Sequence, residues 1–183
     1  TAGLNGSPTS PITLSSYWIF KFQNLSNSYA NWQSVGSAGS LNPGQGYTLK
    51  GSGAAVNQNF TFVGKPNNGA VTGTIAPANL NLSGNPYASA IDATQFINEN
   101  SSSITGTLYF WQHSPTNNTH NLLGYQGGYA SRNLVGGTAP VAPAGIAGVG
   151  TSAKVPGRFI PVGQGFFIVG SGTGGSVNFN NNQ

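Results

Sequence analysis

Short runs of β-branched and aromatic residues, separated by clusters of Gly, Pro, Asn and Ser, constrain this chain more than any other feature. Such a pattern is typical of β-strands joined by turns. It predicts strands at residues 17–22, 46–50, 60–63, 71–75, 80–83, 106–111, 159–160, 165–169 and 176–179. We therefore expect an all-β fold, an antiparallel β-sandwich of the jelly-roll kind.

One stretch alone has helical periodicity, residues 89–98. Its apolar side chains recur at a spacing of about 3.6 residues, and Ser89 with Asp92 resembles a capping box. Residues 136–157 are rich in Ala, Gly, Pro and Val without a period, which predicts a long loop. The first 16 residues have a similar composition, so we expect an extended N-terminal segment followed by a single domain over residues 17–183.

The chain also repeats itself. Residues 43–53 match residues 161–172 with one inserted residue, and each copy contains Gly-Gln-Gly before an aromatic run. Glycine permits a positive φ or a close backbone approach, so each copy predicts a tight turn leading into a strand. We expect two β units, residues 17–63 and 80–180, that share one core.

Charged side chains are almost missing from the sequence. Six basic and two acidic residues make up 4% of the chain, against about 25% in ordinary domains. The six cations are scattered, which argues against nucleic-acid binding. No apolar run approaches the roughly 20 residues that span a bilayer, so no membrane insertion is expected. The absence of Cys removes disulfides and thiolate metal sites.

Acid–base catalysis is limited by the supply of suitable residues. Asp92 and Glu99 fall on or beside the predicted helix, about 10 Å apart along its axis, which fits glycosidase geometry poorly. Asp92 is better explained as a residue at the helix N-terminus. His113 and His120 flank an Asn-rich loop and have too few partners for a metal site or a catalytic triad. We expect no catalytic residues, no metal and no cofactor.

Several ordered blocks carry a resemblance to a known group. They are residues 82–92, 106–111, 127–130, 160–167 and 177–181. In this order the blocks resemble the β-rich region that precedes the C-terminal sorting domain in secreted and surface proteins of Bacteroidota, exported by the type IX secretion system. The resemblance implies an extracellular or cell-surface location and a surface role, and it supplies no catalytic residues.

Two functions of different classes fit these observations. The first is a non-enzymatic structural or adhesive module of a surface layer, filament or large adhesin, whose partners are copies of itself or other surface modules. A nearly uncharged surface suits close packing with neighbours. The N-terminal segment is then the candidate for assembly, with Thr1, Leu4, Ile12 and Leu14 as its contact residues.

The second function is a carbohydrate-binding module with a polysaccharide as partner. Aromatic faces stack on sugar rings, and neighbouring amides bond hydroxyl groups. The candidate stacking residues are Trp32, Trp111, Tyr125 and Tyr129. A further aromatic stripe, Trp18, Phe20 and Phe22, is open to two interpretations, core packing or an exposed platform for sugars.

Overall fold

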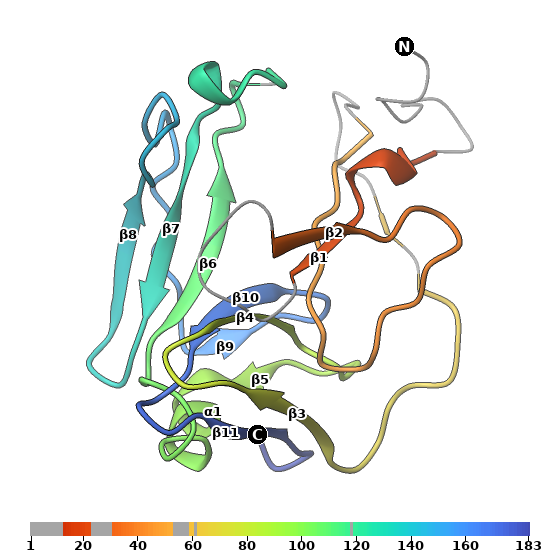
Figure 1. The fold of residues 1–183 in the computed structure, drawn as a ribbon, viewed down its shortest axis with the longest axis vertical. Coiled ribbons are helices and arrows are strands. Elements are labelled where there is room, and N and C mark those ends of the chain that lie inside the picture. The colour runs from red at the N-terminus through yellow and green to blue at the C-terminus, as the bar shows by residue number, and fades with distance from the viewer. Residues whose placement is uncertain (1–12, 23–30, 53–58, 61, 118) are drawn as a thin grey trace.

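The computed structural model describes residues 13–22, 31–52, 59–60, 62–117 and 119–183. Figure 1 shows three tiers of secondary structure in this part of the chain. A central sheet lies between a small two-stranded sheet and a layer that contains the α-helix. All described strand pairs are antiparallel, which confirms the predicted fold class of a mostly β, sandwich-like protein with one short helix.

The central sheet has five strands. In spatial order they are β4 (Leu80–Gly84), β10 (Gly165–Val169), β6 (Leu108–His113), β7 (Gly127–Arg132) and β8 (Gly137–Val141). Phe167 of β10 lies opposite both Leu82 of β4 and Tyr109 of β6, while Trp111 of β6 lies opposite Tyr129 of β7. Because side chains alternate between the two faces of a strand, these five residues share one face of the sheet.

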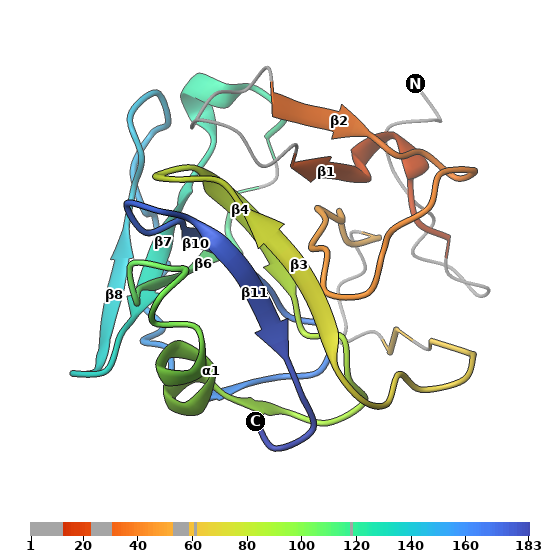
Figure 2. The same ribbon diagram turned by 60° about the horizontal axis from the view of Figure 1, so that its bottom comes forward.

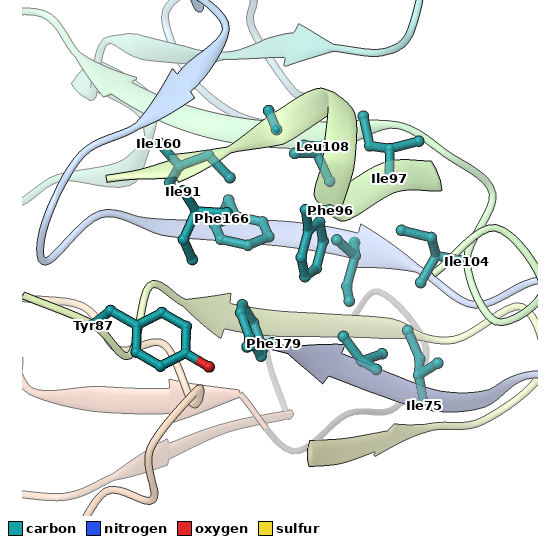
Figure 3. Packing of buried hydrophobic residues seen from close by; sticks show 13 residues of the cluster. Ile75, Tyr87, Ile91, Phe96, Ile97, Ile104, Leu108, Ile160, Phe166 and Phe179 are labelled. Carbon is teal, nitrogen blue, oxygen red and sulfur yellow. The ribbon is translucent and has the colours of Figure 1, made fainter. Parts of the chain in front are cut away.

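The main core lies on the opposite face. It is closed by β3 (Val71–Ile75), β11 (Gly175–Phe179), β5 (Ile91–Asp92), β9 (Phe159–Ile160) and α1 (Ala93–Glu99). Figure 2 shows α1 beside β11, and Figure 3 shows their apolar side chains meeting those of the sheet. Phe96 of α1 contacts Phe166 of β10 edge-on at 5.5 Å between ring centroids and Phe179 of β11 at 5.0 Å.

A smaller apolar cluster covers the first face at the β4 end of the sheet. Here β1 (Phe20–Phe22) pairs with β2 (Trp32–Ser34), and Phe22 and Trp32 pack on Leu82 and Phe167. The 3-10 turn η1 (Ser16–Trp18) precedes β1, and a second one, η3 (Leu122–Gly124), follows β6. The aromatic stripe Trp18, Phe20 and Phe22 is therefore not buried uniformly. Phe22 is buried in this cluster, while Trp18 and Phe20 are half-buried.

The two Gly-Gln-Gly segments have the same turn geometry. Gly44 has φ +79° and the Gln45 N–H donates to the carbonyl of Asn42 at 3.0 Å, while Gly163 has φ +72° and the Gln164 N–H donates to the carbonyl of Pro161 at 3.2 Å. A glycine with positive φ at the third position is what a type II turn requires. The two segments flank β4, because Gln45 bridges Ser83 on one edge and β10 pairs along the other. The larger repeat of two β units stays a prediction.

The helix begins later than its sequence pattern indicates. Ile91 and Asp92 pair with Ile160 and Phe159 as strand residues, so α1 can start only at Ala93. The cap is therefore Asp92, whose side chain accepts hydrogen bonds from the N–H groups of the first helical turn, and the predicted role of Ser89 was wrong.

Two predicted strands were also wrong. Residues 46–50 cross between two strands instead of extending one, since the Gly46 N–H bonds Leu82 of β4 while the Thr48 N–H bonds Phe20 of β1. In the stretch 60–63 the described residues 60, 62 and 63 have no regular structure. In the stretch 17–22, only residues 20–22 form a strand.

Conversely, three strands were missed in addition to β5, whose residues the sequence pattern had assigned to the helix. Strand β2 is only three residues long, β7 begins with two glycines, and β8 lies inside the predicted loop 136–157. Pro140 of β8 has no N–H to donate, which an edge strand such as β8 tolerates.

Candidate functional site

Three of the four candidate sugar-stacking residues meet at one place. The Trp111 ring lies nearly parallel to the Tyr125 ring, with 5.9 Å between centroids and 11° between planes. Tyr129 meets Trp111 edge-on at 5.0 Å. Trp111 and Tyr129 come from the paired strands β6 and β7, while Tyr125 ends the turn η3 that connects them.

The fourth candidate joins the other three through a buried phenylalanine. Phe167 contacts Tyr129 and Trp32, each at 5.9 Å between centroids. Together the five rings form what we call the aromatic band, made of Trp32, Phe167, Tyr129, Trp111 and Tyr125. The four predicted residues are half-buried, while Phe167 is buried.

A glycine makes room for the central indole. A Cβ placed on Gly127 would lie 2.4 Å from Cζ2 of Trp111 and 2.8 Å from the carbonyl oxygen of Gln112. Only a residue without a side chain therefore lets Trp111 lie flat across β7. Sequence reasoning missed this function of Gly127, although the Gly-Gly pair before the aromatic residue Tyr129 was a usable signal.

His113 borders the band at its η3 end. Its ring contacts Tyr125 at 4.9 Å between centroids, and Nε2 bonds the carbonyl of Asn117. A carbonyl only accepts, so Nε2 carries the hydrogen and the neutral ring has its acceptor at Nδ1. That Nδ1 is buried and has no hydrogen-bond partner in the structure. The sequence alone predicted no role for His113 in a metal site or a catalytic triad.

The loop beside His113 is held by its own side chains. Asn117 donates from Nδ2 to the carbonyl of Gly124 at 2.8 Å, and its Oδ1 accepts from the N–H of Thr119 at 3.2 Å. Buried Ser114 contacts the hydroxyl of Thr151 at 3.2 Å, which ties the loop to residues far along the chain. These contacts position η3 and with it Tyr125.

A second aromatic contact lies apart from the band. His120 stacks on Trp18 at 4.9 Å, and Lys50 lies 5.6 Å from the Trp18 ring centre while its Nζ contacts Nε2 of His120. A lysine over an indole face is a cation–π contact. Burial lowers the pKa of Lys50. This contact attaches η1 and residue 50 to the loop after β6.

Both carboxylates are used to hold the fold. Asp92 caps α1 and pairs with Arg158, and these contacts, Arg158 above all, lower its pKa although burial opposes them. Glu99 accepts from the side-chain amides of Gln95, Gln183 and Asn180, which lower its pKa. Among the described residues, the hydrogen bonds and ring contacts of His113 and His120 involve neither carboxylate.

The described residues contain no group of three or more His, Asp or Glu side chains that could hold a metal ion. In the same part of the chain, none of the helices is long and apolar enough to cross a membrane.

Of the candidate assembly residues, only Leu14 is described, and Thr1, Leu4 and Ile12 lie outside the described residues. Leu14 is 36% exposed. It lines an apolar groove of about 420 Å³ together with Ile19, Leu49, Phe60 and Phe62.

The fold and the band define a class: a nearly uncharged, layered antiparallel β protein with a row of aromatic rings in mutual contact on one side of its central sheet. Over residues 2–183 the chain matches the model of the family described as a domain of unknown function, DUF8693, and it belongs to that family. No curated protein and no solved structure matches the chain.

Proposed function

We propose that this protein is a non-enzymatic extracellular adhesive module that binds neutral polysaccharide through the aromatic band. The observation that carries the proposal is the joining of Trp32, Trp111, Tyr125 and Tyr129 through ring contacts on one side of the central sheet. These side chains are separated by up to 97 positions in sequence (129 minus 32). Rows of half-exposed rings provide flat apolar surfaces that complement the faces of successive sugar units.

The surroundings of the band favour an uncharged ligand. His113 contacts the band at Tyr125, and Asn117, an uncharged amide residue, bonds the Gly124 carbonyl next to Tyr125. The whole chain has only six cations, and one of them, Lys50, contacts His120 at a place apart from the band. A polyanion would find few partners here, so a neutral glycan is the better match.

The non-enzymatic part of the proposal is supported by the use of both carboxylates in structural contacts. Asp92 and Glu99 lie at opposite ends of α1, one as its cap and the other as its last residue. The extracellular part is supported by the low charge and by the resemblance to surface proteins described above.

Isothermal titration calorimetry with neutral oligosaccharides tests the proposal. The probes are cellohexaose, laminarihexaose and mannohexaose. The variants Trp111→Leu and Tyr125→Leu keep apolar volume but remove the aromatic face, and each should weaken the affinity at least about fivefold, equivalent to roughly 1 kcal/mol. Tyr17→Leu is the matched control, because Tyr17 is 56% exposed and lies outside the band. Equal affinities in all four proteins, or no binding by the wild type, would reject the proposal.

A second candidate function, self-association into a surface layer or filament, is favoured by exposed apolar side chains. Phe62 is 71% and Phe60 is 47% exposed beside the apolar groove that Leu14 lines. Exposed apolar surface with few charges to keep copies apart promotes association. Light scattering after size-exclusion chromatography decides: a concentration-dependent mass that Phe62→Ser lowers supports self-association, and a monomer at millimolar concentration rejects it.

A further inference from the structure

A second concave site lies on the other side of β4 from the aromatic band. It is a cleft of about 570 Å³ between the edge of β3 and the inner face of β4, closed at one end by Lys21, Phe22 and Gln33 of the β1–β2 sheet. This volume falls within the range of small-molecule sites, about 300 to 1,000 Å³. The cleft exists because β3 and β4, although consecutive, pair with different strands, β11 and β10.

The inner face of β4, which is the face directed toward the main core, carries polar side chains at positions where a core normally has apolar ones. Asn81 and Ser83 lie opposite Ile168 and Phe166, which both point into the main core, while Leu80 and Leu82 face the other way. A strand in a sandwich normally directs its apolar residues inward. Ser83 is only 1% exposed. A buried hydroxyl on the inner face of an edge strand costs stability unless it has a partner.

The side chains on the β4 and Gln33 sides of the cleft have few hydrogen bonds within the described part of the chain. Within the described residues the Ser83 hydroxyl accepts one hydrogen bond, from Nδ2 of Asn81 at 3.4 Å, near the limit of a hydrogen bond. Oδ1 of Asn81 and the side chain of Gln33 make no hydrogen bond within the described part of the chain. Oε1 of Gln45 accepts from the N–H of Asn42 at 3.3 Å, which leaves its NH₂ group to donate.

The cleft floor is apolar and its shape depends on a turn. Phe22, Val177 and Phe179 line it, so amides and hydroxyls surround an apolar base. The wall is the turn at Gly44, where a Cβ would lie 3.2 Å from both Phe179 and Val71. Lys21 is the one charged residue among the described lining residues.

We propose that this cleft is a second, separate binding site for a neutral sugar unit, which Asn81, Ser83, Gln45 and Gln33 bond through its hydroxyls. Amides both donate and accept, as sugar hydroxyls do. The inference takes its ligand class, a neutral sugar, from the proposed function. The location of the site in the cleft does not depend on that function. Two sites on opposite sides of β4 would let one module hold two chains or two points of one chain.

Side-chain NH₂ groups allow a direct test by ¹H–¹⁵N NMR. Titration of the ¹⁵N-labelled protein with cellohexaose, laminarihexaose and mannohexaose should shift the NH₂ signals of Asn81, Gln45 and Gln33 for at least one sugar. The NH₂ signal of Asn98, exposed on α1, should not move. If a synthetic peptide of residues 1–16 shifts the cleft signals and no sugar does, the cleft takes a chain segment and the sugar assignment is wrong.

Two pairs of variants separate this inference from the proposed function. Ser83→Val and Asn81→Leu complete an apolar inner face, so they should abolish the cleft shifts while the protein stays folded and keeps binding at the band. Trp111→Leu should weaken binding at the band and leave the cleft shifts unchanged. Asn98→Ala should change neither the cleft shifts nor binding at the band. Sugar binding that responds to Trp111→Leu but not to the cleft variants overturns the second site and leaves the proposed function standing. Binding that responds only to the cleft variants overturns the band instead.

Discussion

Arg158 donates from Nε to a carboxylate oxygen of Asp92 at 2.8 Å, and its Nη2 lies 2.6 Å from the same oxygen as an ion pair. Asp92 uses its other oxygen to cap α1, accepting from the N–H of Thr94 at 2.9 Å and of Gln95 at 3.4 Å. The Ala93 N–H also bonds the carbonyl of Arg158. One buried carboxylate thus joins the start of the helix to the segment that leads into β9.

Replacement of Asp92 should separate its two roles. Asp92→Ala removes cap and ion pair and should lower the free energy of unfolding by about 1 to 2 kcal/mol. Asp92→Asn keeps an acceptor for the cap and loses only the ion pair, so it should cost under about 1 kcal/mol, since Arg158 is 63% exposed. Urea unfolding measures both values. Equal losses in the two variants would show that the ion pair, not the cap, dominates.

Stability should change little with pH above about 5. In the folded protein the pKa values of Asp92 and Glu99 are lowered from ordinary values near 3.8 and 4.5. A carboxyl whose pKa is lower in the folded than in the unfolded chain stabilises the fold above its unfolded pKa, and this contribution disappears as the pH falls through the folded pKa. Urea midpoints at pH 7, 5 and 3 should therefore fall only between the last two. A steep fall between pH 7 and 5 would contradict the assignment to these carboxyls.

Gly127→Ala should disturb the aromatic band specifically. The new Cβ would overlap the Trp111 ring and the Gln112 carbonyl, so the free energy of unfolding should fall by about 1 to 3 kcal/mol. The tryptophan fluorescence maximum should shift as Trp111 moves toward solvent. The matched control is Gly136→Ala, where a Cβ meets nothing within 4 Å. A Gly127→Ala protein with wild-type stability and fluorescence would show that Trp111 does not lie across β7.

Asn100→Ala should be among the most damaging polar substitutions. This side chain is 1% exposed, donates to the carbonyls of Phe96 and Asn178 at 2.9 Å each, and accepts from the Asn178 N–H at 2.7 Å. It joins the end of α1 to the outer edge of β11, and its loss leaves backbone groups without partners. We expect a loss of about 2 to 3 kcal/mol in urea unfolding. The exposed neighbour Ser101→Ala should have almost no effect, and a similar value for both would contradict the proposed role of the amide.

Local pattern predicted the strands that belong to continuous ladders. β3, β9 and β10 have the bounds that their β-branched and aromatic runs indicated. The failures share a physical cause, which is that the deciding contact is not local. The prediction for residues 46–50 failed because Gly46 and Thr48 bond two different strands. Strand β7 was missed because Gly127 and Gly128 resemble a turn, whereas the first of them makes room for a side chain of β6.

The candidate site, too, was predicted from the sequence only in part. Ring chemistry in the sequence was enough to select Trp32, Trp111, Tyr125 and Tyr129, but it could not indicate Phe167, the buried ring that connects Trp32 to the others. The polar inner face of β4 was equally hidden. The alternation of Leu80 to Ser83 indicates two faces, and only the pairing with β10 shows which face is the inner one.

The sequence by itself determined the all-β class, the turn-forming glycines and the low content of charged side chains. These properties depend on residue type and on spacing within a few positions. The tertiary structure alone decided which rings meet, where the cleft opens and what Asp92 holds, because strand order is set by packing between residues far apart in the chain. A period of two assigns a side chain to a face, and its neighbours on that face are known only once the strands are paired.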